Sequence, residues 1–277
     1  MCILARIKRI CCRHRNKHRY VISSNTDNND VIYDNVKFDL NKSYNNIHTY
    51  TYDYTESPKK IISWNVNEIL CYSTPNSREK ITEHLKHFNC DIICLQGLYN
   101  DYSRKYIINE LKHLYQYYIS GDLYKNYLLL EHSGLFIISK FPITFHKFIP
   151  YDTEFPDNLV NKGILYVTIN NINMVLTDSP YYNDKYYEKY LNTITIKCPF
   201  KEYIIVGTLQ HTTAHDVFNI ECNNKMYTNR NKEISDYILS LYSSLKLNIN
   251  IRHIDINHIS HNYPLIATIE NNYMSYV

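Results

Sequence analysis

The sequence contains little glycine, one tryptophan and no long apolar run. Its 277 residues include only five glycines, and no stretch approaches the roughly 20 apolar residues that a helix needs to cross a bilayer. The N-terminal segment also lacks the features of a secretory signal peptide. Because stable disulfides form mainly in secreted proteins, we expect the eight cysteines to be reduced thiols in an intracellular protein.

Positive charge is concentrated in the first 20 residues. The chain has 30 Lys and Arg against 27 Asp and Glu, a formal net charge of +3. Seven of the basic residues and none of the acidic ones lie in residues 1–20, which leaves 23 basic and 27 acidic residues, or −4, for residues 21–277. A nuclease that grips duplex DNA usually has a basic body. The mildly acidic body therefore makes nucleic acid the less favoured partner.

The composition predicts three regions. Residues 1–20 form a basic, cysteine-containing amphipathic tail, in which apolar residues recur at helical spacing among Arg and Lys. Residues 21–58 are a low-complexity linker rich in Asn, Tyr and Asp, without sustained periodicity. Residues 59–277 are long enough to bury the core of one large α/β domain.

Three cysteines lie among the basic residues of the tail. Cys2, Cys11 and Cys12 are candidates for palmitoylation, and the neighbouring positive charges would add attraction to anionic lipid. Residue 2 is not glycine, which excludes N-myristoylation. We expect this tail to attach the protein peripherally to a cytoplasmic membrane face or to a protein partner. A nucleic-acid arm and an unstructured tail are the alternatives.

Strands and helices alternate in the third region, and its middle is rich in hairpins. This alternation predicts mixed sheets with helices on the outside. We expect strands near residues 60–67, 91–96, 126–131, 134–139, 143–149, 162–169, 172–177, 202–207, 247–254 and 263–269. We expect helices near residues 76–89, 102–118, 184–192 and 230–245.

Six short segments of this region match the signatures of one family, in the right order. They are Ser63-Trp64-Asn65, Leu95-Gln96-Gly97, residues 133–143, Asn161-Lys162-Gly163, Gly207-Thr208-Leu209-Gln210 and Ser260-His261-Asn262-Tyr263-Pro264. Together they resemble the endonuclease/exonuclease/phosphatase superfamily over about residues 60–270, and the Asn-Lys-Gly segment is similar to its neutral sphingomyelinase-like branch. The resemblance implies a DNase I-like fold. This is a four-layer α/β sandwich with two mixed β-sheets packed face to face, helices outside and the active site at the sheet edges.

Phosphodiester hydrolysis of this type needs carboxylates for a divalent cation, a base for the attacking water and donors for the transition-state charge. The resemblance places Asn65 at the asparagine that is retained on the first strand. Gly97 stands where it implies a metal-binding glutamate, and Asp178 stands where it implies a phosphate-contacting histidine. The principal metal ligand is therefore missing, and one phosphate donor is replaced by an acid.

The last two signature segments lack the implied side chains as well. Thr208 and Gln210 replace the Asp and Asn that orient the nucleophile and contact the phosphate. His261 and Asn262 replace an Asp and its partner, the general-base His, so the base becomes an amide. Since single losses of this kind cost about 10²–10⁴ in rate, we expect a pseudoenzyme that needs no cofactor and acts by binding or assembly.

The alternative is a metal-dependent phosphodiesterase or phosphatase, sphingomyelinase-like or nuclease-like, with rewired ligands. His211 and His215 are spaced i, i+4, and the resemblance places Asp178 and His261 near them. Imidazoles suit zinc or manganese. Magnesium or another divalent metal is expected only under this alternative. With 13 histidines in the chain, surface histidines explain the same pattern.

Overall fold

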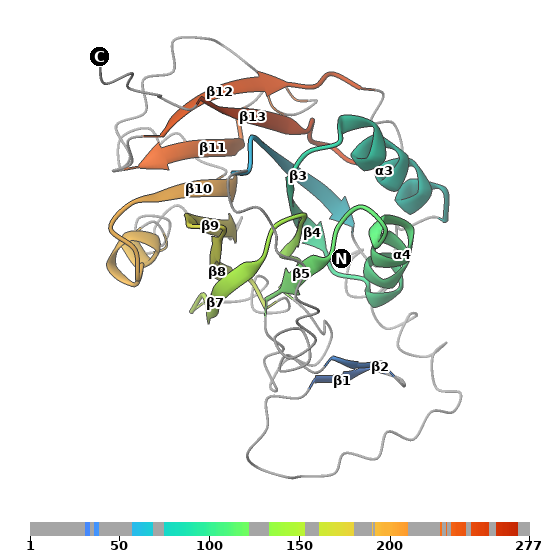
Figure 1. Cartoon of the computed structure of the whole chain (residues 1–277), viewed down its shortest axis with the longest axis horizontal. Coiled ribbons are helices and arrows are strands. Elements are labelled where there is room, and N and C mark those ends of the chain that lie inside the picture. Colours follow the sequence, from blue (N-terminus) through green and yellow to red (C-terminus); the bar gives the residue numbers. More distant parts are fainter. Residues whose placement is uncertain are drawn as a thin grey trace, which may run out of the picture. The chain divides into compact units, whose positions relative to one another are not determined.

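The computed structural model describes residues 31–33, 36–38, 57–68, 75–121, 133–152, 161–179, 190, 192–209, 228, 231, 234–241, 245–254 and 259–270. Contacts divide the chain into two units, Met1–Tyr54 and Thr55–Val277. In the first unit, β1 (Val31–Tyr33) pairs antiparallel with β2 (Val36–Phe38). The other described elements belong to the second unit (Figure 1).

One sheet of the second unit has six strands within the described ranges. From edge to edge these strands are β12 (Lys246–Ile251), β13 (Leu265–Glu270), β3 (Lys60–Glu68), β4 (Ile92–Leu98), β6 (Phe136–Ser139) and β5 (Tyr117–Ser120). The central pair, β3 and β4, runs parallel, and the other neighbours run antiparallel. A parallel pair needs a crossover connection. Here α3 (Pro75–Phe88) lies in that connection.

The second sheet has five strands in the described part of the chain. In spatial order they are β11 (Asp236–Leu241), β10 (Tyr203–Thr208), β9 (Ile172–Asp178), β8 (Gly163–Ile169) and β7 (Ile143–Pro150). Only β9 and β10 run parallel. Both strands therefore end on the same side of the sheet, which places Asp178 beside Thr208 in the pairing register.

The two sheets pack face to face around an apolar core. Ile61 and Ile92 from the first sheet meet Leu165, Leu176 and Ile204 from the second, and all five side chains are fully buried. Because successive strand residues point to opposite faces, the neighbours of these residues lie on the outer face of each sheet and form separate apolar clusters there. The sandwich of two mixed sheets that the resemblance implies is confirmed.

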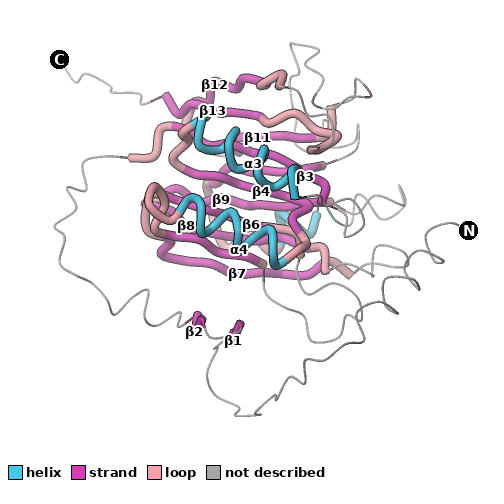
Figure 2. The backbone as a smooth tube through the Cα atoms, turned by 90° about the vertical axis from the view of Figure 1, so that its right-hand side faces the viewer, coloured by secondary structure: helices cyan, strands magenta, loops and turns pink. Residues whose placement is uncertain are grey.

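Two helices cover the outer face of the six-stranded sheet. Leu85 from α3 and Ile107 from α4 (Asp101–Leu111) pack with Ile62 and Trp64 of β3, and the helices lie side by side across the strands (Figure 2). The outer face of the five-stranded sheet carries its own cluster, to which Ile194 contributes from a short helical segment. No helix among the described residues is long and apolar enough to cross a membrane.

Two helix predictions were wrong over part of their expected range. The helix expected at residues 230–245 is absent over residues 236–241, which form β11. Its apolar residues Ile234, Ile238 and Leu241 recur at i, i+4 and i+7, a helical spacing. In the sheet, however, Tyr237 and Ile238 point to opposite faces, toward different clusters. Pairing with β10 has overridden the local pattern.

The helix expected at residues 102–118 ends at Leu111, and β5 follows it. Its N-terminus is capped by Asn100, whose side chain accepts a hydrogen bond from the Tyr102 N–H. The strand expected at residues 126–131 and most of the helix expected at residues 184–192 lie outside the described residues. So does the tail with Cys2, Cys11 and Cys12.

Candidate functional site

The retained asparagine joins the two sheets at the edge where the site is expected. Asn65 lies near the end of β3, and its Nδ2 donates to Oγ1 of Thr208, the last residue of β10, at 2.8 Å. Asn65 is 7% exposed and Thr208 is fully buried. The resemblance therefore identified two positions that do meet, although they are 143 residues apart in the chain.

A buried aspartate from β11 is the centre of the site. Thr208 Oγ1 donates to Asp236 Oδ1 at 2.7 Å, and Ser235 Oγ and Asn262 Nδ2 each donate to Oδ2 at 2.8 Å. Burial raises the pKa of Asp236 to about 6; the three hydrogen bonds oppose this shift, and the nearby Asp178 adds to it. Each oxygen of the carboxylate thus accepts at least one hydrogen bond. These hydrogen bonds connect the five residues of what we call the edge network: Asn65, Thr208, Ser235, Asp236 and Asn262.

Asp236 is the residue that the sequence analysis missed. It was placed inside an expected helix and belongs to none of the quoted signature segments. The available signal was its position at the start of Asp236-Tyr237-Ile238-Leu239, an acid followed by β-branched and aromatic residues of the kind found in strands. Thr228 supports it, because Thr228 Oγ1 accepts from the N–H groups of Ser235 and Asp236 at 2.8 and 3.2 Å.

The loop that carries Asn262 is fastened to β3. Ser260 Oγ donates to the carbonyl of Asn65 at 2.6 Å and accepts from the Asn262 N–H at 2.9 Å. Trp64 Nε1 donates to the carbonyl of Asn262 at 3.0 Å. His261, which lies between Ser260 and Asn262 in the sequence, is exposed. The carboxylate that contacts Asn262 is Asp236.

Gly97 occupies a position in which a side chain does not fit. Its φ is +67°, and a Cβ there would lie 2.7 Å from Asn65 Oδ1 and 2.8 Å from the Asn67 backbone nitrogen. The Asn65 oxygen already accepts a hydrogen bond from that Asn67 N–H at 3.0 Å. The backbone between Asn65 and Glu68 is irregular, with Asn67 at φ 45°. Substituting a glutamate alone would therefore not rebuild a metal ligand without moving β3 or β4.

Asp178 is paired with a lysine from the Asn-Lys-Gly segment. Lys162 Nζ lies 3.5 Å from Asp178 Oδ1 and donates to the carbonyl of Ser179 at 3.0 Å. Tyr99 donates its hydroxyl to Asp178 Oδ2 at 3.2 Å. Asp178 is 3% exposed and Lys162 is 9% exposed. The acid that stands where the resemblance implies a histidine is thus matched by a buried cation.

The remaining candidates after β10 stay predictions. Gln210, His211 and His215 lie outside the described residues. Among the described residues, no three His, Cys, Asp or Glu side chains come close enough to hold a metal ion. The described cysteines Cys90, Cys94 and Cys198 are free thiols.

Several solved structures share this fold. Beta toxin from Staphylococcus aureus is 17% identical, with a TM-score of 0.59 over 76% of this chain and 100% of its own. Sphingomyelinase C from Streptomyces griseocarneus is 13% identical, with a TM-score of 0.57 over 78% and 100%. An AP endonuclease from Archaeoglobus fulgidus is 16% identical, with a TM-score of 0.54 over 77% and 100%. A beta toxin variant was solved with bound magnesium ions.

At these identities the structural likeness shows the fold. No curated protein sequence matches the chain significantly. A family model described as the Endonuclease/Exonuclease/phosphatase family matches residues 62–231, which is more than half of the 277 residues. The chain belongs to the Endonuclease/Exonuclease/phosphatase family.

Proposed function

We propose that this chain is a pseudoenzyme of its family, which keeps the fold and acts by binding or assembly. The observation that carries the proposal is the edge network. Hydrogen bonds join Asn65 to Thr208 across the two sheets, and both Thr208 and Asn262 to Asp236. Groups that satisfy one another inside a protein stabilise it, and a metal or a phosphate would have to compete with their hydrogen bonds.

The hydrogen bonds of Asn65 and Asp236 argue against a magnesium site between them. Magnesium takes an octahedral set of oxygen ligands and is usually held by one or two carboxylates. Gly97 has no side chain, the Asn65 oxygen accepts from Asn67, and both Asp236 oxygens accept from neighbouring side chains. An ion bound here would compete with these hydrogen bonds. We therefore propose no step that runs through a metal.

A general base is missing from its expected place as well. The amide of Asn262 has no basic nitrogen, and its NH₂ group donates to Asp236. Removing a general base or a transition-state donor costs about 10²–10⁴ in rate for each group. Several such losses in one site leave little catalysis above background.

Turnover of bis-p-nitrophenyl phosphate by the full chain tests this proposal. With Mg²⁺, Mn²⁺ or Zn²⁺ we expect rates equal to those of the metal alone, because neither the metal ligands nor the base is in place. Turnover above the blank that disappears in His261→Ala would contradict the proposal. It would establish the rewired hydrolase, with Asp178, His211 and His215 as the further ligands to examine.

We propose in addition that the basic tail attaches the protein to a cytoplasmic membrane face. The support is the sequence of residues 1–20, in which Cys2, Cys11 and Cys12 lie among seven basic residues. Acyl exchange on the full chain from cells should label these cysteines and lose the label when all three are changed to serine. Equal labelling of the triple variant would contradict the attachment.

A further inference from the structure

We infer that the outer face of the five-stranded sheet carries a docking surface for anionic lipid headgroups. The surface consists of Phe145 and Lys147 on β7 and Ile196, Lys197 and Lys201 on the segment that crosses this face, and it is called the lysine patch below. Ile196 is 79% exposed and Phe145 is 38% exposed. All three lysines are exposed. The patch shares no residue with the edge network, so the inference holds whether or not the chain hydrolyses phosphodiesters.

Pairing in the sheet shows that the two β7 residues face outward. Lys147 lies opposite Tyr166 in the β7–β8 register, and Tyr166 belongs to the cluster on the outer face. Residues opposite one another in an antiparallel pair share a face, as do residues two apart along one strand. The Lys147 and Phe145 side chains therefore lie on the outer face of β7.

The second segment is fixed over the same face. The Tyr166 hydroxyl donates to the carbonyl of Ile194 at 3.2 Å. Phe200 stacks edge-on against Phe145, with ring centroids 5.6 Å apart, and against Tyr166, at 6.3 Å. Ile194 is fully buried while Ile196 is exposed. The segment thus holds one isoleucine against the sheet and presents the next to solvent.

The charge around the exposed isoleucine has one predominant sign. Lys197 follows Ile196 directly, and Lys201 follows the packed Phe200. Glu202 is the one acidic residue between positions 192 and 202. Single exposed apolar residues are ordinary. Here two of the four large exposed apolar side chains in the described structure share one face with three lysines.

This composition fits a lipid surface better than a protein partner. Protein interfaces are enriched in Tyr, Trp and Arg and depleted in Lys, and a stable one buries about 800 Å² on each side. The lysine patch has two apolar side chains, three lysines and no arginine. Insertion of a few apolar groups between headgroups, supported by lysines that attract anionic lipid, is the usual combination for peripheral membrane binding.

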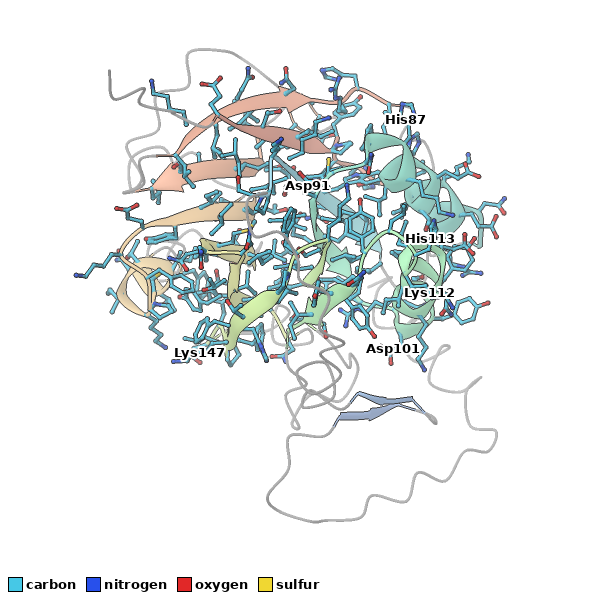
Figure 3. All side chains as sticks on the ribbon, viewed as in Figure 1. His87, Asp91, Asp101, Lys112, His113 and Lys147 are labelled. Atoms are coloured by element: carbon cyan, nitrogen blue, oxygen red, sulfur yellow. The ribbon has the colours of Figure 1, made fainter. Side chains whose placement is uncertain are left out.

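Co-sedimentation of the full chain with phosphatidylcholine vesicles, with and without phosphatidylserine, tests the inference. Each variant keeps the basic tail, so the contribution of the tail is common to all. Ile196→Ser should lower the partition coefficient on phosphatidylserine vesicles about tenfold, and Lys147→Gln should lower it about fivefold. The matched controls Lys112→Gln and Leu114→Ser lie just after the end of α4. Figure 3 shows Lys112 well away from Lys147. Both controls should leave the partition coefficient unchanged.

A fluorescence readout locates the contact directly. The only native tryptophan, Trp64, is 1% exposed, so Ile196→Trp adds a reporter on the surface. Its emission should shift to the blue on phosphatidylserine vesicles, whereas that of Leu114→Trp should not. Unchanged partition of both patch variants, or no shift at position 196, would overturn the inference. A shift with polyglutamate but not with vesicles would also overturn it, in favour of an acidic protein partner.

Discussion

The carboxylate of Asp236 accepts hydrogen bonds from three side chains and lies near a second acid, Asp178. Burial disfavours its charged form, which raises the pKa to about 6, while the three donors limit the rise. A group of this kind is a cost to the folded state once it ionises. Without the Asp236 carboxylate, however, the three donors around it would be buried without partners.

The unfolding free energy should therefore depend on pH through Asp236. Its folded pKa of about 6 lies above the value of about 3.9 in an unfolded chain. The folded state binds the proton more tightly, so this stabilising contribution is complete below pH 4. It is lost as the pH rises to about 6, by on the order of 3 kcal/mol. Urea unfolding of the full chain and of Asp236→Asn between pH 4 and 8 measures it. Parallel pH profiles for the two proteins would contradict the assignment.

Gly97 is a second residue on which the site geometry depends. Gly97→Ala should lower the unfolding free energy by about 1–3 kcal/mol, because φ is +67° and the new Cβ would approach Asn65 and Asn67 too closely. Urea denaturation of the full chain checks the value. In an Asn65→Ala background the further loss caused by Gly97→Ala should be smaller but not zero, since the Asn67 nitrogen still lies 2.8 Å from the Cβ position. A neutral Gly97→Ala would mean that β3 and β4 adapt easily.

At the scale of elements, the strands that form the core could be predicted and β11 could not. β3 and β4 are short runs of Ile, Val and Trp or Leu, bounded by polar residues, and they lie within two residues of their expected ends. β11 has a helical spacing of Ile234, Ile238 and Leu241, and only its pairing with β10 decides between helix and strand. That pairing is a tertiary property, which no local window contains.

Thr208 is the point at which the end of β10 is tied to the other sheet. Thr208→Val should lower the unfolding free energy by about 2–4 kcal/mol, because the Asn65 amide and an Asp236 oxygen both lose their partner while buried. Thr82→Val is the matched control, since Thr82 is also buried but bonds only to the Arg78 carbonyl within α3. The control should cost less than about 1 kcal/mol. Equal losses in urea unfolding would show that the cross-sheet link contributes little.

Across the whole molecule, the position of the site could be predicted from the order of the signature segments, but its hydrogen-bond pattern could not. Asn65, Thr208 and Asn262 could be placed at one edge because each lies at or near the end of an expected strand. Their hydrogen bonds depend on how far the five-stranded sheet is shifted over the six-stranded one. The connecting residue, Asp236, lies in a segment without a motif. Packing of the two sheets thus determines what the replaced residues do.

The same packing separates binding from catalysis in this account. The edge network joins the sheets from inside, while the lysine patch lies on the outer face of one of them. The proposed pseudoenzyme would keep both features, because each depends on the sandwich and neither depends on an ion. Loss of the edge network should therefore lower the unfolding free energy without changing the residues of the lysine patch.

Calorimetric titration of the full chain with Mg²⁺ and Mn²⁺ tests the central claim most directly. The claim is that the Asn65 and Asp236 oxygens at the sheet edge already accept hydrogen bonds from Thr208, Ser235, Asn262 and Asn67. We predict no saturable heat for either ion, and the same trace for Asp236→Asn. Saturable binding of one ion per chain that is lost in Asp236→Asn or Asp178→Asn would contradict the claim.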